Sequence, residues 1–392
     1  MAEFKCEVVR VKVVPHPNAD RLDIAQVGDY QSIIGKGYVK DGDLAVYIPE
    51  QAVVPEWLLR ELKLWDETKG KGMCAGSLGN RVKAIKLRGV LSQGVIYRAN
   101  CGDDPNPTVA LVSVLRGSEP EIWESCPCEE SDDVSEFLGV VKYEPKLPSH
   151  MMGKAIGVDL DITHNYDFDN LKKHPRLFDD GEQVVITEKI HGTLLQVAVV
   201  PQSKENDKLY KGRVALTSKG LGGRGIILDH NDETNLYAQT VKKHGIADKL
   251  IENFSKLADA TNSPIIIFGE VFGRTLSGAG VQDLTYTDEE LDFRAFDMCY
   301  GVRADAKFFD FRTFTTACSV MGLKTVPVLY EGPFSKAVVA EHTDGNTTLS
   351  TKKQIREGVV VKSLLSDGKG NRKIAKSVSE AYLLRKDATE FN

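Results

Sequence analysis

The 392-residue chain has no apolar run of about 18 residues, the length that a membrane-spanning helix requires. Its first residues, MAEFKCEVVR, are charged and contain no apolar core, so we expect neither a secretion signal nor a membrane partner. Cysteine is also scarce: seven are scattered along the chain, and only Cys126 and Cys128 are close together. Scattered thiols favour a reducing compartment, the cytoplasm or the cytosol of a host cell.

The sequence contains no G-x-x-x-x-G-K-[ST] phosphate loop, no internal repeat and no low-complexity segment. A net charge of −6 argues against a protein that binds polyanions over its whole surface, although a local basic groove can still bind phosphates. The content of 42% hydrophobic and 27% charged residues is typical of a globular protein. Together with the length, it predicts two or three domains.

Residues 1–100 consist of short β-branched stretches separated by glycine turns, a pattern typical of a small closed β-barrel. One helix is expected just after Pro55. The runs HPNADRL at 16–22 and KLRGVLSQG at 86–94 resemble OB-fold modules related to tRNA-binding domains. The densest basic cluster lies here and favours a groove that follows a nucleic-acid backbone, with a solvated strand as the alternative: Arg81, Lys83, Lys86 and Arg88.

Residues 101–150 differ in character, because no basic residue occurs between Arg116 and Lys142 while acidic residues and prolines accumulate. Like-charge repulsion and proline favour an extended chain, so this segment is expected to be an acidic connector between domains.

Residues 151–392 are predicted to form an α+β domain with antiparallel sheets. Buried strands are expected within 181–193, 263–273, 291–301 and 356–363, and the apolar spacing over 235–260 is helical. The stretch LLQVAVV at 194–200 is expected to pair with 181–193. The glycine-rich run GLGGRG at 220–225 is expected to be a mobile loop.

The most informative motif is EKIHGT at 188–193, in which Lys189 ends an apolar strand. It resembles the Lys-x-Asp-Gly motif of covalent nucleotidyltransferases, in the histidine form of RNA ligases. Five further blocks that resemble this superfamily follow in order: TSKGLGGRG at 217–225, FGEVFG at 268–273, FRAFDM at 293–298, EGVVVK at 357–362 and RKIAKS at 372–377. An OB module, a connector and a ligase domain in this order resemble RNA ligases of the Naegleria type.

The resemblance implies a covalent mechanism in which Lys189 attacks the α-phosphate of ATP. Pyrophosphate leaves, and the lysyl-N-AMP passes AMP to a 5′-phosphate end, which a 3′-hydroxyl then attacks. The lysine amine must be deprotonated to attack, so we expect Lys362, Lys376 and a Mg²⁺ or Mn²⁺ ion to lower its pKa from about 10.4.

The resemblance also implies residue roles. Glu188 lies near the base, and Phe296 stacks on adenine unless it is ordinary core. Lys219 contacts ribose or phosphate. Glu270 and Glu357 serve the ribose or the metal, unless Glu270 is simply a carboxylate beneath a core strand. Lys362 holds the α-phosphate. The remaining predicted site residues are His191 and Gly192, which shape the nucleotide site, Lys376 of the fifth block, and Arg224 and Arg274, which contact nucleic acid.

Two details of the motifs leave alternatives open. Strict strand alternation places Glu357 and Lys362 on opposite faces, so a bend at Gly358 is expected to bring both to the site. The fifth block reads Lys373-Ile374-Ala375-Lys376 where relatives tend to have Lys-x-Lys, which leaves the part of Lys373 open.

The leading hypothesis is an ATP-dependent RNA ligase, expected to act as a monomer on nicked duplex RNA or an RNA/DNA hybrid. A minimal ATP-dependent DNA ligase is the first alternative, and a catalytically inactive RNA-binding protein is the second. The histidine in KIHG and the N-terminal position of the OB module favour RNA. We expect no second OB domain after the fifth block, which counts against long DNA ligases and capping enzymes.

Overall fold

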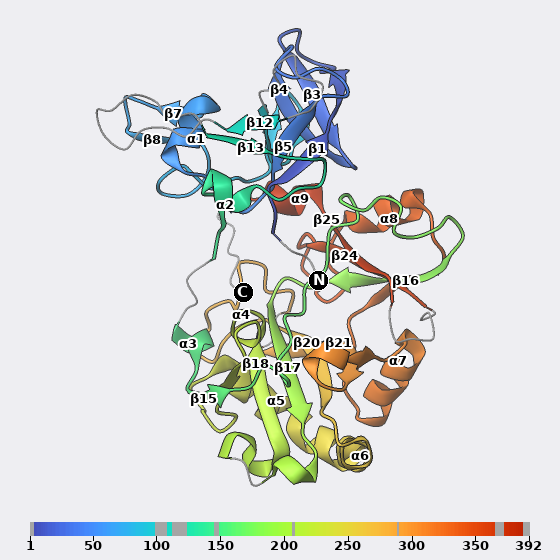
Figure 1. Ribbon diagram of the computed structural model, residues 1–392. Helices are drawn as coiled ribbons and strands as arrows, with labels where there is room; N and C mark the ends of the chain where they lie inside the picture. The colour runs from blue at the N-terminus through green and yellow to red at the C-terminus, as the bar shows by residue number, and fades with distance from the viewer. Residues whose placement is uncertain are drawn as a thin grey trace. The chain divides into compact units, whose positions relative to one another are not determined.

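The computed structural model describes residues 4–98, 108–111, 124–144, 149–205, 208–287, 290–364 and 372–386 (Figure 1). The chain forms two compact units. One comprises Ala2–Glu144 with Lys172–Pro175, and the other comprises Pro145–Leu171 with Arg176–Asn392. No helix in the described ranges is long and apolar enough to cross a membrane.

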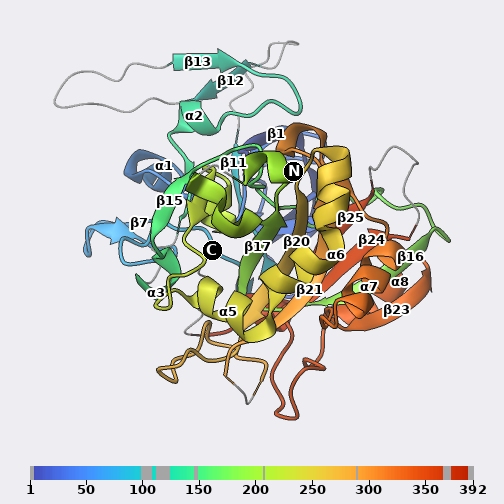
Figure 2. The ribbon, with the colours of Figure 1, turned by 90° about the horizontal axis from the view of Figure 1, so that it is seen from below.

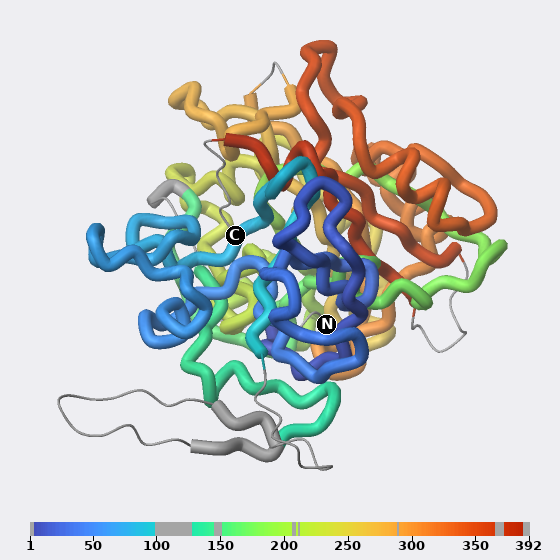
Figure 3. Tube along the Cα trace, turned by 90° about the horizontal axis from the view of Figure 1, so that it is seen from above, coloured from blue at the N-terminus to red at the C-terminus, as the bar shows by residue number. Residues whose placement is uncertain are grey.

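The N-terminal unit, the blue to cyan tube of Figure 3, is built from short antiparallel strands around a β5 strand that is buried at every position. One sheet has the order β1-β5-β11 and another the order β2-β3-β4. The helix expected after Pro55 is α1, which buries Leu58 and Leu59 in the core. The principal elements are β1 (Glu7–Arg10), β2 (Lys12–Pro15), β3 (Leu22–Val27), β4 (Tyr30–Gly35), β5 (Leu44–Ile48), α1 (Glu56–Glu61) and β11 (Val95–Arg98).

Part of the predicted acidic connector is folded rather than extended. Residues 128–144 belong to the N-terminal unit: Val134 and Leu138 are buried in its core, and β14 pairs with β6. Residues 101–107, 112–123 and 145–148 of the connector lie outside the described residues. The smaller elements are β6 (Ala52–Val53), β7 (Trp65–Asp66), β8 (Lys71–Gly72), β9 (Ile85–Leu87), β10 (Val90–Ser92), β12 (Thr108–Leu111), β13 (Glu124–Pro127), α2 (Ser135–Leu138) and β14 (Val141–Lys142).

The second unit contains two antiparallel sheets, as the α+β prediction requires. A seven-stranded sheet has the order β15-β19-β18-β17-β20-β21-β22, and a four-stranded sheet has the order β23-β16-β24-β25. The strands are β15 (Ala155–Val158), β16 (Gln183–Lys189), β17 (Thr193–Val199), β18 (Val214–Ser218), β19 (Ile226–Leu228), β20 (Ile265–Phe272), β21 (Asp292–Tyr300), β22 (Lys307–Phe308), β23 (Val328–Pro333), β24 (Gly358–Ser363) and β25 (Ile374–Val378).

The expected pairing of 194–200 with 181–193 is wrong. β16 pairs with β23 and β24, whereas β17 pairs with β18 and β20 in the other sheet. The chain therefore passes from one sheet to the other at residues 190–192, directly after Lys189. Both strands are apolar enough to be buried on two faces, so neither needed the other as a partner.

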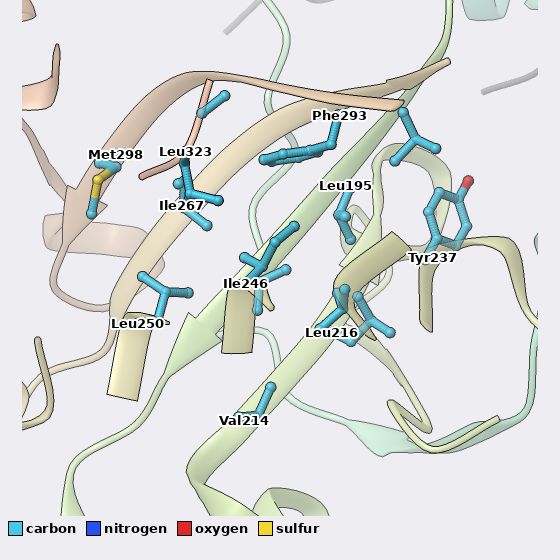
Figure 4. Close-up of a cluster of buried hydrophobic side chains, with 14 of the residues drawn as sticks. Leu195, Val214, Leu216, Tyr237, Ile246, Leu250, Ile267, Phe293, Met298 and Leu323 are labelled. Carbon is cyan, nitrogen blue, oxygen red and sulfur yellow. The ribbon is translucent and has the colours of Figure 1, made fainter. Parts of the chain in front are cut away.

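The helical stretch 235–260 forms two helices, because Gly245 adopts a left-handed φ of 61° between α5 and α6. Helix α6 packs on β17 and β20 (Figure 2). Ile246 and Leu250 of α6 belong to the same hydrophobic core as Leu195 of β17 and Ile267 of β20 (Figure 4). The helical elements are α3 (Ser149–Met152), η1 (Gln202–Lys204), η2 (Lys208–Arg213), α4 (Lys219–Gly222), α5 (Leu236–His244), α6 (Ile246–Thr261), η3 (Arg303–Asp305), α7 (Phe311–Val320), α8 (Lys336–Thr343) and α9 (Glu380–Leu383).

The glycine-rich run 220–225 is only partly the loop that its composition suggested, because residues 223–225 form a turn. It begins in the short helix α4, which packs against β17, β18 and β19. Gly222 is buried, and a Cβ atom there would lie 2.9 Å from Gln196 Nε2 and 3.0 Å from the His164 carbonyl oxygen. Gly222 therefore allows close packing of α4 against β17.

Candidate active site

Lys189 is the last residue of β16, and its ammonium forms an ion pair with Glu357, at 2.6 Å between Nζ and Oε1. The two residues meet because Lys189 is in register with Gly358, the first residue of β24. Gly358 has a φ of 150°, and a Cβ atom there would lie 2.1 Å from the Ser377 carbonyl oxygen. A larger residue would therefore push β24 away from β25 at the point where Glu357 reaches Lys189.

The electrostatic environment of Lys189 differs from the one expected. Burial alone would lower its pKa, but the carboxylates of Glu357 and Glu270 outweigh burial and raise the pKa above its ordinary value. The expectation that the pKa of Lys189 is lowered overall is therefore wrong for the nucleotide-free protein. Two carboxylates lie closer to the amine than the sequence argument allowed for.

Glu270 lies on β20, where burial raises its pKa to about 8, against the opposing effect of the Lys189 cation. The turn at Gly192 packs directly on this strand: a Cβ atom at 192 would lie 2.2 Å from the Val271 carbonyl oxygen and 2.9 Å from Glu270 Cγ. Gly192 thus lets the residues after Lys189 approach the carboxylate closely.

Two further lysines share one carboxylate close to Lys189. Asp167 contacts Lys376 Nζ at 3.3 Å and Lys219 Nζ at 3.6 Å. Burial, together with the cations of Lys219 and Lys189, lowers the pKa of Lys376. Lys373 instead pairs with Glu182 at 2.7 Å on the other side of the β25 strand and does not join this cluster.

Glu188 is buried beside Lys189 and only half of its carboxylate is satisfied. Its Oε2 accepts hydrogen bonds from the Thr348 backbone N–H at 2.9 Å and hydroxyl at 2.8 Å. Within the described residues, Glu188 Oε1 and the buried Tyr286 hydroxyl have no hydrogen-bond partner. A buried acceptor without a partner is costly, so a ligand donor at Oε1 would stabilise the site.

Phe296 and Lys362 form a second group. The ladder between β20 and β21 is irregular, with Phe268 opposite Asp297 and Gly269 opposite Ala295, so Phe296 is the extra residue. Lys362 Nζ donates to the Phe296 carbonyl at 2.5 Å and lies 3.4 Å from Asp297, which also contacts Arg372 and Tyr166. Burial lowers the pKa of Lys362 to about 7. Its amine thus supports the backbone of Phe296 rather than joining the Lys189 pair.

His191 contacts groups from two distant segments. Its Nε2 lies 2.8 Å from Asp283 Oδ1, and its Nδ1 lies 2.8 Å from Tyr382 Oη and 3.9 Å from Glu357 Oε2. Burial alone would raise the pKa of Asp283, but hydrogen bonds from His191 and Arg385 hold it far below its usual range.

The predicted nucleic-acid residues occur in both units. Arg224 and Arg274 are exposed, and Arg274 donates to the Gly278 carbonyl at 3.0 Å. In the N-terminal unit, Lys86 and Arg88 are exposed around the β9–β10 hairpin. Arg81 lies over the Tyr143 ring, at 4.1 Å from its centroid.

Sequence reasoning missed several residues that the fold brings to the site. Asp297 lies within the FRAFDM block, where only Phe296 was given a role. The others come from segments far from the motifs or just beyond them, and no local pattern distinguishes them: Asp167, Asp283, Thr348, Tyr382 and Arg385. Among the described residues, no group of three or more His, Cys, Asp or Glu side chains is arranged to hold a metal ion.

A lysine at a strand end, paired with one glutamate and acted on by a second, in a domain of two antiparallel sheets, resembles the site of a nucleotidyltransferase. A family model described as RNA ligase matches residues 182–378, slightly more than half of the chain, and an OB-fold domain model matches residues 6–99. The chain belongs to the RNA ligase family. The OB-fold match confirms the fold predicted for the N-terminal unit.

Solved structures of Naegleria gruberi RNA ligase have a similar fold over the whole chain. Its structure with PPi has a TM-score of 0.71 at 21% identity and covers 97% of this chain and 98% of that one. Variants with ATP and Mn, and with AMP and Mn, have the same TM-score and coverage at 19% and 20% identity. Comparison with curated proteins found no match.

Proposed function

We propose that this enzyme is an ATP-dependent RNA ligase that joins 3′-hydroxyl and 5′-phosphate ends through a lysyl-N-AMP on Lys189. The observation that carries the proposal is the pairing of Lys189 with Glu357 at 2.6 Å, inside the region that matches the RNA ligase family. A nucleophile held by an oriented partner is the arrangement that covalent catalysis requires.

The residues around Lys189 fit ATP. Glu188 Oε1 is a buried acceptor without a hydrogen-bond partner among the described residues, and the exocyclic amine of adenine is a matching donor. Phe296 is partly exposed and offers a ring face for stacking on the base. Lys219 and Lys376 are cations beside Lys189 that can bind the phosphates in place of Asp167.

Glu270 and Glu357 are the groups that would hold a Mg²⁺ or Mn²⁺ ion, because hard divalent cations prefer carboxylate oxygens. Such an ion would neutralise phosphate charge during transfer. Both carboxylates act on the pKa of Lys189, so a cation between them would weaken their effect and favour the neutral amine. Structures of Naegleria gruberi RNA ligase contain Mn with ATP or AMP.

The chemistry then follows from these positions. The ammonium of Lys189 must lose its proton before its Nζ attacks the α-phosphate of ATP, which forms the P–N bond and releases pyrophosphate. The 5′-phosphate of the nucleic acid next takes the AMP, freeing the lysine. Finally the 3′-hydroxyl attacks the activated 5′-phosphate, AMP leaves, and the phosphodiester bond is complete.

The nucleic acid in this proposal is a nicked duplex of RNA, or an RNA/DNA hybrid, bound by a monomer. Residues 1–100 would contribute the OB-fold module, to which 128–144 add part of the core, the rest of 101–150 the acidic connector, and 151–392 the ligase domain. The exposed Lys86 and Arg88 of the N-terminal unit, with Lys83 and Arg81, would contact the phosphate backbone. Arg224 and Arg274 would add contacts in the ligase domain.

The substrate is tested with 5′-labelled nicked duplexes made of RNA, DNA or both, incubated with the protein, ATP and a divalent metal. Sealing of the RNA nick supports the proposal. Exclusive sealing of the all-DNA nick would identify a DNA ligase instead. Removal of 1–100 should slow sealing more than lysine adenylylation, whereas equal loss of both would assign the module to folding.

A further inference from the structure

The segment that follows β25 contacts Glu357, the ion-pair partner of Lys189, and His191, two residues after Lys189 in the sequence. Ser379 is fully buried, and its backbone N–H donates to the carbonyl of Glu357 at 2.9 Å. Its hydroxyl donates to Asp344 Oδ1 at 2.7 Å and caps α9 by accepting from the Tyr382 N–H. The first residue of this segment therefore fixes the backbone that carries the partner of Lys189.

Three residues after Ser379, Tyr382 contacts His191. Its hydroxyl lies 2.8 Å from His191 Nδ1, and the two rings meet edge to face with centroids 5.2 Å apart. The opposite nitrogen of His191 faces the carboxylate of Asp283 at 2.8 Å. The tyrosine hydroxyl and the carboxylate therefore hold the two ring nitrogens of His191 from two sides.

Arg385 connects these contacts. Its Nε donates to Asp283 Oδ2 at 2.9 Å, its NH1 donates to the Tyr382 carbonyl at 2.8 Å, and its guanidinium lies 3.6 Å from the centre of the Tyr382 ring. Asp283 lies in the loop after β20. The preceding residue, Gln282, donates a hydrogen bond to the Gly192 carbonyl at 2.9 Å. His191 is thus held from two segments that are remote in sequence.

We infer that Ser379, Tyr382, Arg385 and Asp283, here called the α9 clamp, position the Lys189–Glu357 pair for nucleotidyl transfer. The inference rests on the proposed function. Ser379 fixes the backbone of Glu357, while Tyr382 and Asp283 fix the ring of His191, whose Nδ1 lies 3.9 Å from Glu357 Oε2. Members of the clamp are positioning residues, because they act on Lys189 only through Glu357 and His191.

The geometry explains why positioning is needed here. Glu357 lies outside β24, so the ladder with β16 does not by itself fix its side chain. Lys189 lies at the end of β16, where the chain leaves the sheet. Without the clamp, both members of the pair would sample several rotamers, and the fraction with a productive geometry would fall.

The test measures single-turnover adenylylation of the full chain with α-labelled ATP for two isosteric variants, Tyr382→Phe and Asp283→Asn. Tyr382→Phe removes one hydrogen bond and keeps the ring under Arg385, so the rate at saturating ATP should fall about 3- to 10-fold. Asp283→Asn removes a charge-assisted bond and should cost about 10- to 100-fold. The KM for ATP should stay within about threefold in both, because neither residue touches the nucleotide in this proposal.

A matched control is Tyr210→Phe, which removes a buried tyrosine hydroxyl from Asp159 outside the site. It should lower the melting temperature comparably and leave the adenylylation rate unchanged. A double-mutant cycle adds a second readout: in a His191→Ala background, Tyr382→Phe should have no further effect on the rate.

Wild-type rates in both clamp variants would overturn the inference, as would rate losses in Tyr210→Phe equal to those in Tyr382→Phe. Equal losses caused by Tyr382→Phe with and without His191 would also overturn it, because the tyrosine would then act independently of the histidine. Failure of the wild-type protein to adenylylate would instead refute the proposed function itself.

Discussion

Substitution of Gly192 by alanine perturbs the centre of the site with a single methyl group. A Cβ atom there would lie 2.2 Å from the Val271 carbonyl oxygen and 2.9 Å from Glu270 Cγ. Because unstrained carbon contacts are about 3.5–4.0 Å, the turn after Lys189 must move by roughly 1 Å. Overpacking of this size costs about 1–3 kcal/mol of stability.

A displacement of about 1 Å between reacting groups typically costs about 100-fold in rate, and we expect that loss in lysine adenylylation. The melting temperature should fall by roughly 2–4 °C for each kcal/mol lost. Scanning calorimetry and a labelled-ATP assay measure the two effects. The control is Gly35→Ala, because a Cβ atom there has nothing within 4 Å. Wild-type stability and rate in Gly192→Ala would refute the claim that this glycine is required by close approach to β20.

Three further predictions concern buried charges and the fifth motif. The folded-state pKa of Glu270, about 8, exceeds its ordinary value of 4.5, so its neutral form contributes stability below pH 4.5 that is lost as pH rises to 8. Glu270→Gln should therefore flatten the decline of unfolding free energy with pH in urea titrations, and an unchanged slope would contradict this. Asp297→Ala leaves Lys362 and Arg372 without their buried counter-ion and should cost about 3–5 kcal/mol in the same titrations, whereas exposed Asp305→Ala should change little. Lys376→Ala should slow adenylylation about 10- to 100-fold, whereas Lys373→Ala should stay near wild type; similar losses in both would count against the assignment of Lys376 alone.

Sequence reasoning identified the strands correctly where a continuous apolar run left no other choice, as in β20 and β24. It could not determine which strands pair. β16 and β17 are adjacent in sequence and almost wholly buried, yet they belong to different sheets, and only long-range packing decides this. Composition was also partly misleading at 220–225, because glycine permits close packing as readily as motion.

In the candidate site, too, local sequence identified some residues, whereas long-range packing alone determined others. Motif spacing led to Lys189, Glu270 and Glu357, which the fold does bring together. The direction of the Lys189 pKa shift was wrong because it depends on distances between side chains from different strands. Asp283 and Tyr382 carry no recognisable local pattern, so only the fold reveals their contacts with His191.

The central claim is that Lys189 is the covalent carrier of AMP. The most direct measurement incubates the protein with α-labelled ATP and a divalent metal, after pyrophosphate treatment to remove any AMP already bound, and resolves it on a denaturing gel. Label that remains on the wild type and is absent from Lys189→Ala is the predicted result. Label on both proteins, or on neither with ATP, GTP or NAD, would contradict the account.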